Sequence, residues 1–241
     1  MKKYTIFIIA LAFALTLGAC SDDDSTPVVT PSTEGTFTDA DGSVYGWVRI
    51  GNLDWMTTSY HGGEAWNTQT MISTTGFENG LYSPHSDEEE AALILSRGNF
   101  YTYQQALDLC PEGWRLPTDD DWKQLEMALG MSQKAADAEG WRNGAGYLMA
   151  QEAGQGTGLA MKYAGEVTPW ASSVPSLYRE GDYGYYWSAT KDTTKAHECA
   201  FIRVITPVAD KVERVATTTS DNYLSVRYVR DASILYTNSQ K

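Results

Sequence analysis

Residues 110–118 read Cys-Pro-Glu-Gly-Trp-Arg-Leu-Pro-Thr, and this stretch decides how the middle of the chain folds. Its two prolines lack a backbone N–H group and bracket a corner that carries Trp114. Thr118, after the second proline, is a suitable helix N-cap, and the three aspartates at 119–121 suit the positive end of a helix dipole. The stretch therefore predicts a tight corner from which a helix begins.

Helical periodicity flanks this corner on both sides. Before it, Thr102 can cap a helix over residues 103–109, which carries apolar residues on one face. After it, apolar residues at 122–129 recur at helical spacing, and Gly130 ends the pattern. The sequence thus predicts two main helices, one on each side of the corner.

Two acidic runs also belong to helix starts. Ser86 stands three residues before Glu89, which is the capping-box spacing, and predicts a further helix over 86–95. Acidic runs can indicate cation sites. However, residues 87–90 lack the alternating ligand spacing of a calcium loop, and capping accounts for both 87–90 and 119–121. We therefore expect no metal at either run.

Strands are predicted in the rest of the chain. Glycine-rich, polar stretches separate these strands and predict long irregular loops. Because the helices and the strands are grouped in different parts of the chain, the sequence favours an α+β fold with antiparallel sheets. Residues 45–56 alternate around a Gly51-Asn52 turn, as in a hairpin. Further strand candidates lie at 183–190, 200–204, 212–215 and 224–231.

The first residues are typical of an exported lipoprotein. Two lysines precede an apolar run that is too short to span a membrane, so residues 1–19 are predicted to be a signal peptide. Leu-Gly-Ala-Cys at 17–20 resembles the bacterial lipobox, in which the cysteine thiol, here that of Cys20, receives a diacylglycerol. The alternative is an ordinary secretory signal that happens to contain a cysteine.

A flexible tether is predicted after the anchor, because residues 20–43 are rich in Ser, Thr, Pro and Asp and can bury little surface. The Ser-Asp run at 21–24 resembles the export signal of lipoproteins on the surface of Bacteroidetes-type bacteria. We therefore expect a lipid anchor in the outer membrane with the protein on the cell surface; the alternative is the periplasmic face. One folded domain is predicted at 44–232, followed by a tail at 233–241.

The charge balance excludes one class of partner. The chain has 18 Lys and Arg against 31 Asp and Glu, for a net charge of −13. A nucleic acid is bound through cationic side chains, so no nucleic-acid partner is expected. With 42% hydrophobic and 12% aromatic residues, the chain has enough apolar material for a folded core.

Four motifs follow one another along the chain. They are Val-Arg-Ile-Gly-Asn at 48–52 with Trp-Met at 55–56, the corner at 110–118 with Asp-Trp at 121–122, Gly-Tyr-Tyr-Trp-Ser-Ala-Thr at 184–190, and Ser-Val-Arg-Tyr-Val-Arg-Asp at 225–231. Together they resemble a known family, the Fibrobacter succinogenes major paralogous domain of bacterial surface and secreted proteins. The resemblance covers about residues 45–231 and implies a fold similar to C-type-lectin-like and formylglycine-generating-enzyme-like domains.

The resemblance also implies a cysteine pairing, from which this chain departs. The family commonly has a cysteine at the position of Tyr228, which would pair with the one at the corner, here Cys110. If strands at 199–204 and 224–230 were antiparallel neighbours, Cys199 would lie beside Tyr228. We therefore expect a Cys110–Cys199 disulfide, which an oxidising compartment favours. The alternative is two buried free thiols.

No catalytic, cofactor or metal-binding set is expected. The three histidines, His61, His85 and His197, have no zinc-ligand spacing. His197 and Cys199 would share one face of a strand, but no third group orients them. Nucleophile-elbow, phosphate-loop and dinucleotide motifs are missing from the sequence. The oxidase chemistry of formylglycine-generating relatives needs cysteines near the C-terminal strand, where Tyr228 stands.

The sequence therefore predicts a non-catalytic, surface-anchored lipoprotein that binds an extracellular ligand, with a glycan as the first candidate. Aromatic rings in loops suit the C–H faces of sugars, although most such rings are expected to be buried. The alternatives are a structural or adhesive protein with a protein partner and, behind both, an enzyme. The ligand-binding candidates are Trp66, Trp141, Trp170, Tyr178 and Tyr183.

Overall fold

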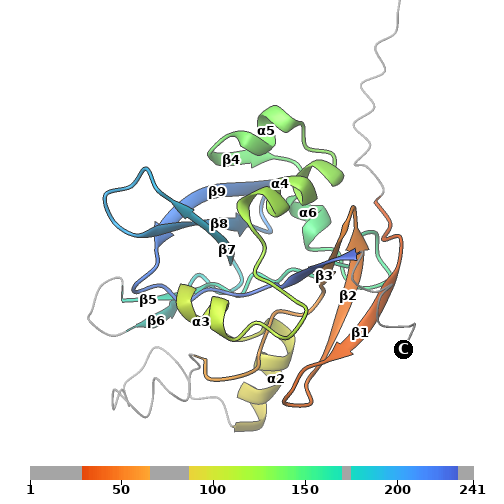
Figure 1. The fold of residues 1–241 in the computed structure, drawn as a ribbon, viewed down its shortest axis with the longest axis vertical. Coiled ribbons are helices and arrows are strands. Elements are labelled where there is room, and N and C mark those ends of the chain that lie inside the picture. Colours follow the sequence, from red (N-terminus) through yellow and green to blue (C-terminus); the bar gives the residue numbers. More distant parts are fainter. Residues whose placement is uncertain (1–28, 66–86, 170–174, 233–241) are drawn as a thin grey trace, which may run out of the picture.

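The computed structural model describes residues 29–65, 87–169 and 175–232 (Figure 1). Several predicted features lie outside the described residues. They are the signal peptide, Cys20, Trp66, His85, Ser86, Trp170 and the tail at 233–241.

The described residues form a mixed α+β fold built around antiparallel sheets. The first sheet has the order β1-β2-β3-β10, the second has the order β4-β9-β8-β7, and β5 and β6 form a separate hairpin. The strands are β1 (Glu34–Thr38), β2 (Val44–Ile50), β3 (Leu53–Met56), β4 (Gly140–Asn143), β5 (Glu166–Thr168), β6 (Ser176–Tyr178), β7 (Gly184–Asp192), β8 (Cys199–Ile205), β9 (Lys211–Thr218) and β10 (Val229–Asp231).

Short helices pack between and beside the sheets. Figure 1 shows α4 and α5 beside the second sheet and the β5–β6 hairpin at the end of the molecule away from β1. The α+β class with antiparallel pairing is confirmed. The helices are α2 (Asp87–Arg97), α3 (Tyr103–Asp108), α4 (Asp119–Ala128), α5 (Gln133–Asp137) and α6 (Gly146–Met149).

The predicted hairpin at 45–56 is formed by β2 and β3. Ile50 pairs with Leu53 across a two-residue turn in which Gly51 has a φ of 63°, a left-handed conformation that favours glycine. Val48 and Trp55 face each other in the register and are buried in the same core cluster. The opposite face of the hairpin is buried too, since Trp47 and Met56 belong to a second core cluster and Asp54 is fully buried.

The predicted tether is too long, because β1 lies inside it. Residues 34–38 pair in antiparallel register with β2, from Glu34 opposite Val48 to Thr38 opposite Val44. Phe37 supplies the apolar contact, stacking on Trp114 with ring centroids 4.5 Å apart and on Tyr45 at 5.2 Å. The assignment of residues 20–43 to a flexible tether is therefore wrong for this strand, and the folded unit begins before residue 44.

The corner at 110–118 folds as predicted, with a capped helix on each side. Thr102 forms a capping box with Gln105 at the start of α3, and Thr118 forms one with Asp121 at the start of α4. Trp114, in the corner, is buried, and the guanidinium group of Arg230 lies 4.6 Å from its ring. The corner thus joins the two helices to the first sheet.

The C-terminal segment differs from the prediction of one strand over 224–231. Only Val229–Asp231 forms a strand, β10, and it pairs with β3. Leu224 and Ser225 make single bridges to Tyr101 and Tyr186 instead. The neighbours of β8 are β7 and β9, so the expected pairing of 199–204 with 224–230 is wrong.

Strands β7 and β8 of the second sheet pack on their two faces against different core clusters. Tyr186 belongs to one cluster and its neighbours Tyr185 and Trp187 belong to the other, as alternation along β7 requires. The first cluster includes residues of α4 and the second includes residues of α3. Among the described helices, none is long and apolar enough to cross a membrane.

Candidate functional site

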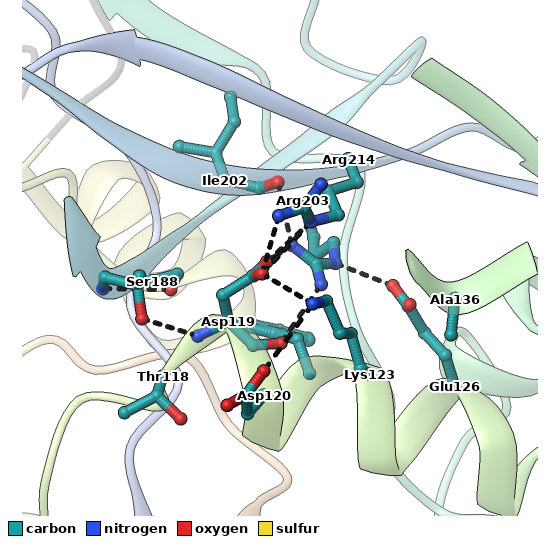
Figure 2. Close-up of polar contacts among 12 residues, drawn as sticks. Thr118, Asp119, Asp120, Lys123, Glu126, Ala136, Ser188, Ile202, Arg203 and Arg214 are labelled. Carbon is teal, nitrogen blue, oxygen red and sulfur yellow. Dashed lines mark hydrogen bonds and ion pairs between the residues drawn. The ribbon is translucent and has the colours of Figure 1, made fainter. Parts of the chain in front are cut away.

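A buried ion-pair network is the densest group of charges in the described residues. Asp119, in the first turn of α4, accepts hydrogen bonds from Arg203 of β8 at 2.8 Å and from Arg214 of β9 at 2.8 and 2.9 Å. Figure 2 shows its carboxylate between the two guanidinium groups, with Lys123 beside it. Lys123 lies 3.3 Å from the same carboxylate.

Glu126 continues the network two turns along α4 from Asp119. It accepts from Arg203 at 2.6 Å and from Arg142 of β4 at 2.7 and 2.8 Å, and both guanidinium groups are buried. Arg203 also donates to the backbone carbonyl of Ile202, and Arg142 donates to the backbone carbonyl of Ala136. These contacts attach α4 to β4, β8 and β9 of the second sheet.

Two opposing effects act on the pKa of Asp119. Burial acts to raise it, but the hydrogen bonds and positive charges of Arg214 and Arg203 outweigh burial and lower the pKa to about 2. Asp121, in the same turn, also pairs with Arg115. The first-turn aspartates therefore cap α4 and also attach it to other segments.

Among residues 29–65, 87–169 and 175–232, no three His, Cys, Asp or Glu side chains are placed to hold a metal ion.

A row of four side chains crosses the second sheet and forms a different kind of site. Trp141 of β4 is opposite Glu213 of β9, Glu213 is opposite Val204 of β8, and Val204 is opposite Tyr185 of β7. Directly opposed residues of antiparallel strands project from the same face. Trp141, Glu213 and Tyr185 therefore share one face of the sheet, although they lie far apart in the sequence.

Tyr183 closes this row into a continuous aromatic surface. Its ring lies 6.2 Å from the ring of Trp141 and 6.1 Å from the ring of Tyr185, so the three rings are in contact across four strands. Trp141 is 42% exposed, Tyr183 is half-buried and Tyr185 is buried. We call Trp141, Tyr183 and Tyr185 the aromatic patch.

An ion pair from the β5–β6 hairpin borders the aromatic patch. Arg179 follows β6, donates to the hydroxyl of Tyr185 at 2.7 Å and lies 5.9 Å from the ring of Tyr183. It also pairs with Glu166 of β5 at 3.1 Å. Burial raises the pKa of Glu166, and the charge of Arg179 acts in the opposite direction. The hairpin is held to the patch by a parallel bridge from Gly165 to Gly184.

Glu213 is the second acidic group at the patch. It is half-buried, and burial raises the pKa of its carboxyl group, with Arg142 acting to lower it. Unlike Glu166, Glu213 has no hydrogen-bond or ion-pair partner for its carboxylate among the described residues. The patch thus combines an exposed indole, two tyrosine rings, one neutralised carboxylate and one unpartnered carboxylate.

The structure brings two of the five predicted ligand-binding aromatics into contact, namely Trp141 and Tyr183. Tyr178 lies at the end of β6, opposite Glu166 in the register, and is half-buried. Trp66 and Trp170 lie outside the described residues. For all five aromatic residues, a role in ligand binding stays a prediction.

Sequence reasoning missed four groups at the patch. Tyr185 could have been found, because alternation along 183–190 places it on the same face as Tyr183. Arg179, Glu166 and Glu213 could not, because their positions depend on how β5, β6 and β9 pair with distant segments. No local spacing in the sequence carries that information.

The expected Cys110–Cys199 disulfide is wrong in this structure, where both cysteines are free. Tyr228 fills the space beside Cys110, and its hydroxyl donates to the carbonyl of Ala106 at 2.9 Å. Cys199 begins β8, between β7 and β9, away from Tyr228. Burial raises the pKa of the Cys110 thiol to about 12, which makes it a poor nucleophile at neutral pH.

The described histidines do not form a catalytic group. His197 lies in an exposed bend before β8, so it does not share a strand face with Cys199 as expected. His61 packs against Tyr45 with ring centroids 4.6 Å apart. The side-chain amide of Asn222, beside Asp221, donates to the hydroxyl of Thr217 and to the carbonyl of Thr218, so it stabilises the turn.

Comparison with known proteins gives one family. The sequence profile of the Fibrobacter succinogenes major domain matches residues 48–230. No curated protein and no solved structure matches the chain.

Proposed function

The chain belongs to the Fibrobacter succinogenes major domain family, and from this premise and the aromatic patch we propose that it is a non-catalytic lipoprotein that binds an extracellular glycan. The observation that carries the proposal is the contact between the exposed indole of Trp141 and the ring of Tyr183. The exposed indole of Trp141 offers a flat face on which a sugar ring can stack, and the ring of Tyr183, inclined at 48° to the indole, lies beside that face.

Two features of the patch support a binding role over a purely structural one. Trp141 keeps a large part of its side chain in water, while the other described tryptophans, Trp47, Trp55, Trp114, Trp122 and Trp187, are buried. Arg179 and Glu166 add polar groups at its border, which can fix the orientation of a sugar through hydroxyl contacts. Stacking supplies affinity and these groups supply specificity.

The finer fold and the location belong to the same proposal. A C-type-lectin-like arrangement agrees with the long segment between α6 and β5 that has no regular structure. We also propose that Cys20 carries the lipid and that the domain faces the outside of the outer membrane, with the periplasmic face as the alternative. Mass spectrometry of the mature N-terminus tests the lipid. Protease treatment of intact cells tests exposure, and a fully protected protein would contradict it.

The glycan proposal is tested by binding to a panel of polysaccharides, followed by titration of tryptophan fluorescence with each positive ligand. Trp141→Ala should weaken binding at least about tenfold, because it removes the larger stacking face. Leu107→Ala, another exposed apolar residue, on α3, is the matched control and should bind as the parent does. Binding by the parent that Trp141→Ala leaves unchanged would contradict the site.

A protein partner is the second candidate, and one observation favours it. Tyr147 is 46% exposed and Val208 is 80% exposed, and the backbone N–H of Tyr147 donates to Asp210 near Val208. Exposed apolar side chains at one end of β4 and β9 suit a protein surface. Loss of a cell-surface partner from Tyr147→Ala with glycan binding intact would favour this candidate.

A further inference from the structure

We propose that the ligand of the aromatic patch carries a positive charge, and that it is an amino sugar whose protonated amine binds the carboxylate of Glu213. This inference rests on the proposed function, since the same surface would stack the sugar ring. It adds the chemical class of the glycan, which stacking alone does not determine.

Glu213 stands directly opposite Trp141 in the β4–β9 pair, and Val204 separates it from Tyr185 in the same row. Trp141 and Tyr183 come into contact from the two ends of this row, so their contact spans the strands that carry Glu213 and Val204. A ring stacked on Trp141 would therefore place its substituents within reach of Glu213.

Among the described residues, the Glu213 carboxylate has neither a hydrogen bond nor an ion pair. Arg142 and Arg214 are committed to Glu126 and Asp119 in the buried network. Lys211, two residues along the same face, forms no ion pair in the part of the chain that the structure describes. Burial has removed part of the water around the Glu213 carboxylate, and no described cation pairs with it in return.

Electrostatics then selects among sugars. A protonated amine restores the lost interaction at Glu213, and the negative faces of aromatic rings also attract cations. A neutral sugar can stack on Trp141 and donate hydroxyl groups to the carboxylate, but it leaves the negative charge without a counter-ion. An acidic sugar meets Glu213 and a chain of net charge −13, and both repel it. An amino sugar supplies both a ring that can stack on Trp141 and the counter-ion that Glu213 lacks.

The experiment compares two oligosaccharides with the same backbone, a glucosamine oligomer and its fully N-acetylated counterpart, by calorimetry at low and moderate salt. The glucosamine oligomer should bind at least about tenfold more tightly, and salt should reduce that difference. Glu213→Gln should weaken binding of the glucosamine oligomer about tenfold and leave the acetylated oligomer unchanged. Because the carboxylate has no partner, Glu213→Gln should keep the melting temperature of the parent.

Glu112→Gln is the control for the general attraction of a polycation to an anionic protein. Glu112 is exposed at the corner and lies outside the patch, and its variant should bind both oligomers as the parent does. Equal binding of the two oligomers, or a Glu213→Gln variant that still prefers glucosamine, would overturn this inference and leave the proposed function standing. Failure of both oligomers and of the wider panel to bind would overturn both.

Discussion

Arg227 is a fully buried cation that no described carboxylate neutralises. Its guanidinium group donates to the carbonyls of Met56 and Leu159 at 2.8 Å and of Ala160 at 2.7 Å, and to the hydroxyl of Ser59 at 3.2 Å. Burial lowers its pKa from the ordinary value, and the nearby Tyr186 acts in the opposite direction. One side chain thus fixes β3 and the irregular segment around residue 160 to the C-terminal segment.

Replacing Arg227 should be among the most damaging single changes in the chain. Arg227→Met should lower the free energy of unfolding by about 3 kcal/mol or more, because it leaves buried carbonyls without donors. Arg227→Lys should recover only part of this, because an ammonium group lacks the planar fork. Urea unfolding of both variants measures the effect.

Lys191→Met is the matched control, because the ion pair of Lys191 with Glu198 is exposed and should contribute little. If Arg227→Met unfolded at the same urea concentration as this control, the central role of Arg227 would be refuted.

The sequence alone could not show that Arg227 is buried. Alternation over 224–231 placed it on the face opposite Tyr228, where a charged residue suits solvent. The carbonyls that receive it come from residues 56, 159 and 160, and no periodicity reports on contacts between segments so distant.

Helix α4 illustrates what one element gains from local and from distant contacts. Its start at Thr118 was predictable, since a capping box is encoded within four residues. Its attachment to β8 and β9 through Asp119 was not, because Arg203 and Arg214 approach from strands that follow much later in the chain. Capping alone appeared sufficient for the aspartates, so the sequence concealed the buried network.

Acid should weaken the attachment of α4 within a defined pH range. The pKa of Asp119 is lowered from 3.8 to about 2 in the folded protein, so its ionised form is stabilised by folding. This stability is present above about pH 4 and is lost as the pH falls towards 2, an effect on the order of 2 kcal/mol. Urea unfolding at several pH values measures it.

Asp119→Asn should be less stable than the parent at neutral pH by about 3 kcal/mol, because two buried guanidinium groups lose their shared counter-ion. Its stability should fall less steeply between pH 4 and pH 2. Asp120→Asn, at an exposed neighbouring position, should behave as the parent. An unchanged pH dependence in Asp119→Asn would contradict the assignment.

At the scale of the whole molecule, packing without a disulfide joins the corner to the sheets. We expect Cys110 and Cys199 both to be thiols in the purified protein, detected by alkylation after unfolding and mass spectrometry of the two peptides. A reducing agent should then leave the melting temperature unchanged. Recovery of a Cys110–Cys199 peptide pair under non-reducing conditions would contradict the structure.

The sequence predicted the α+β class, the hairpin at 45–56 and both capped helices, because these features depend on neighbours within a few residues. It did not predict which distant segments pair with one another. The disulfide was inferred from a strand pairing that β7 and β9 occupy instead, and the aromatic patch depends on a register across four strands. Long-range pairing is what a single sequence least reveals.

Strand β1 has a practical consequence for recombinant expression. The family profile begins at Val48, in the middle of β2, so a fragment trimmed to that boundary would lack β1 and the first half of its partner strand. Phe37, Tyr45 and Trp47 would be deleted together, leaving Trp114 uncovered and a hole in the cluster beneath it. Such a fragment would invite aggregation through the bare edge of β2, whereas a start ahead of Glu34 would retain the cover.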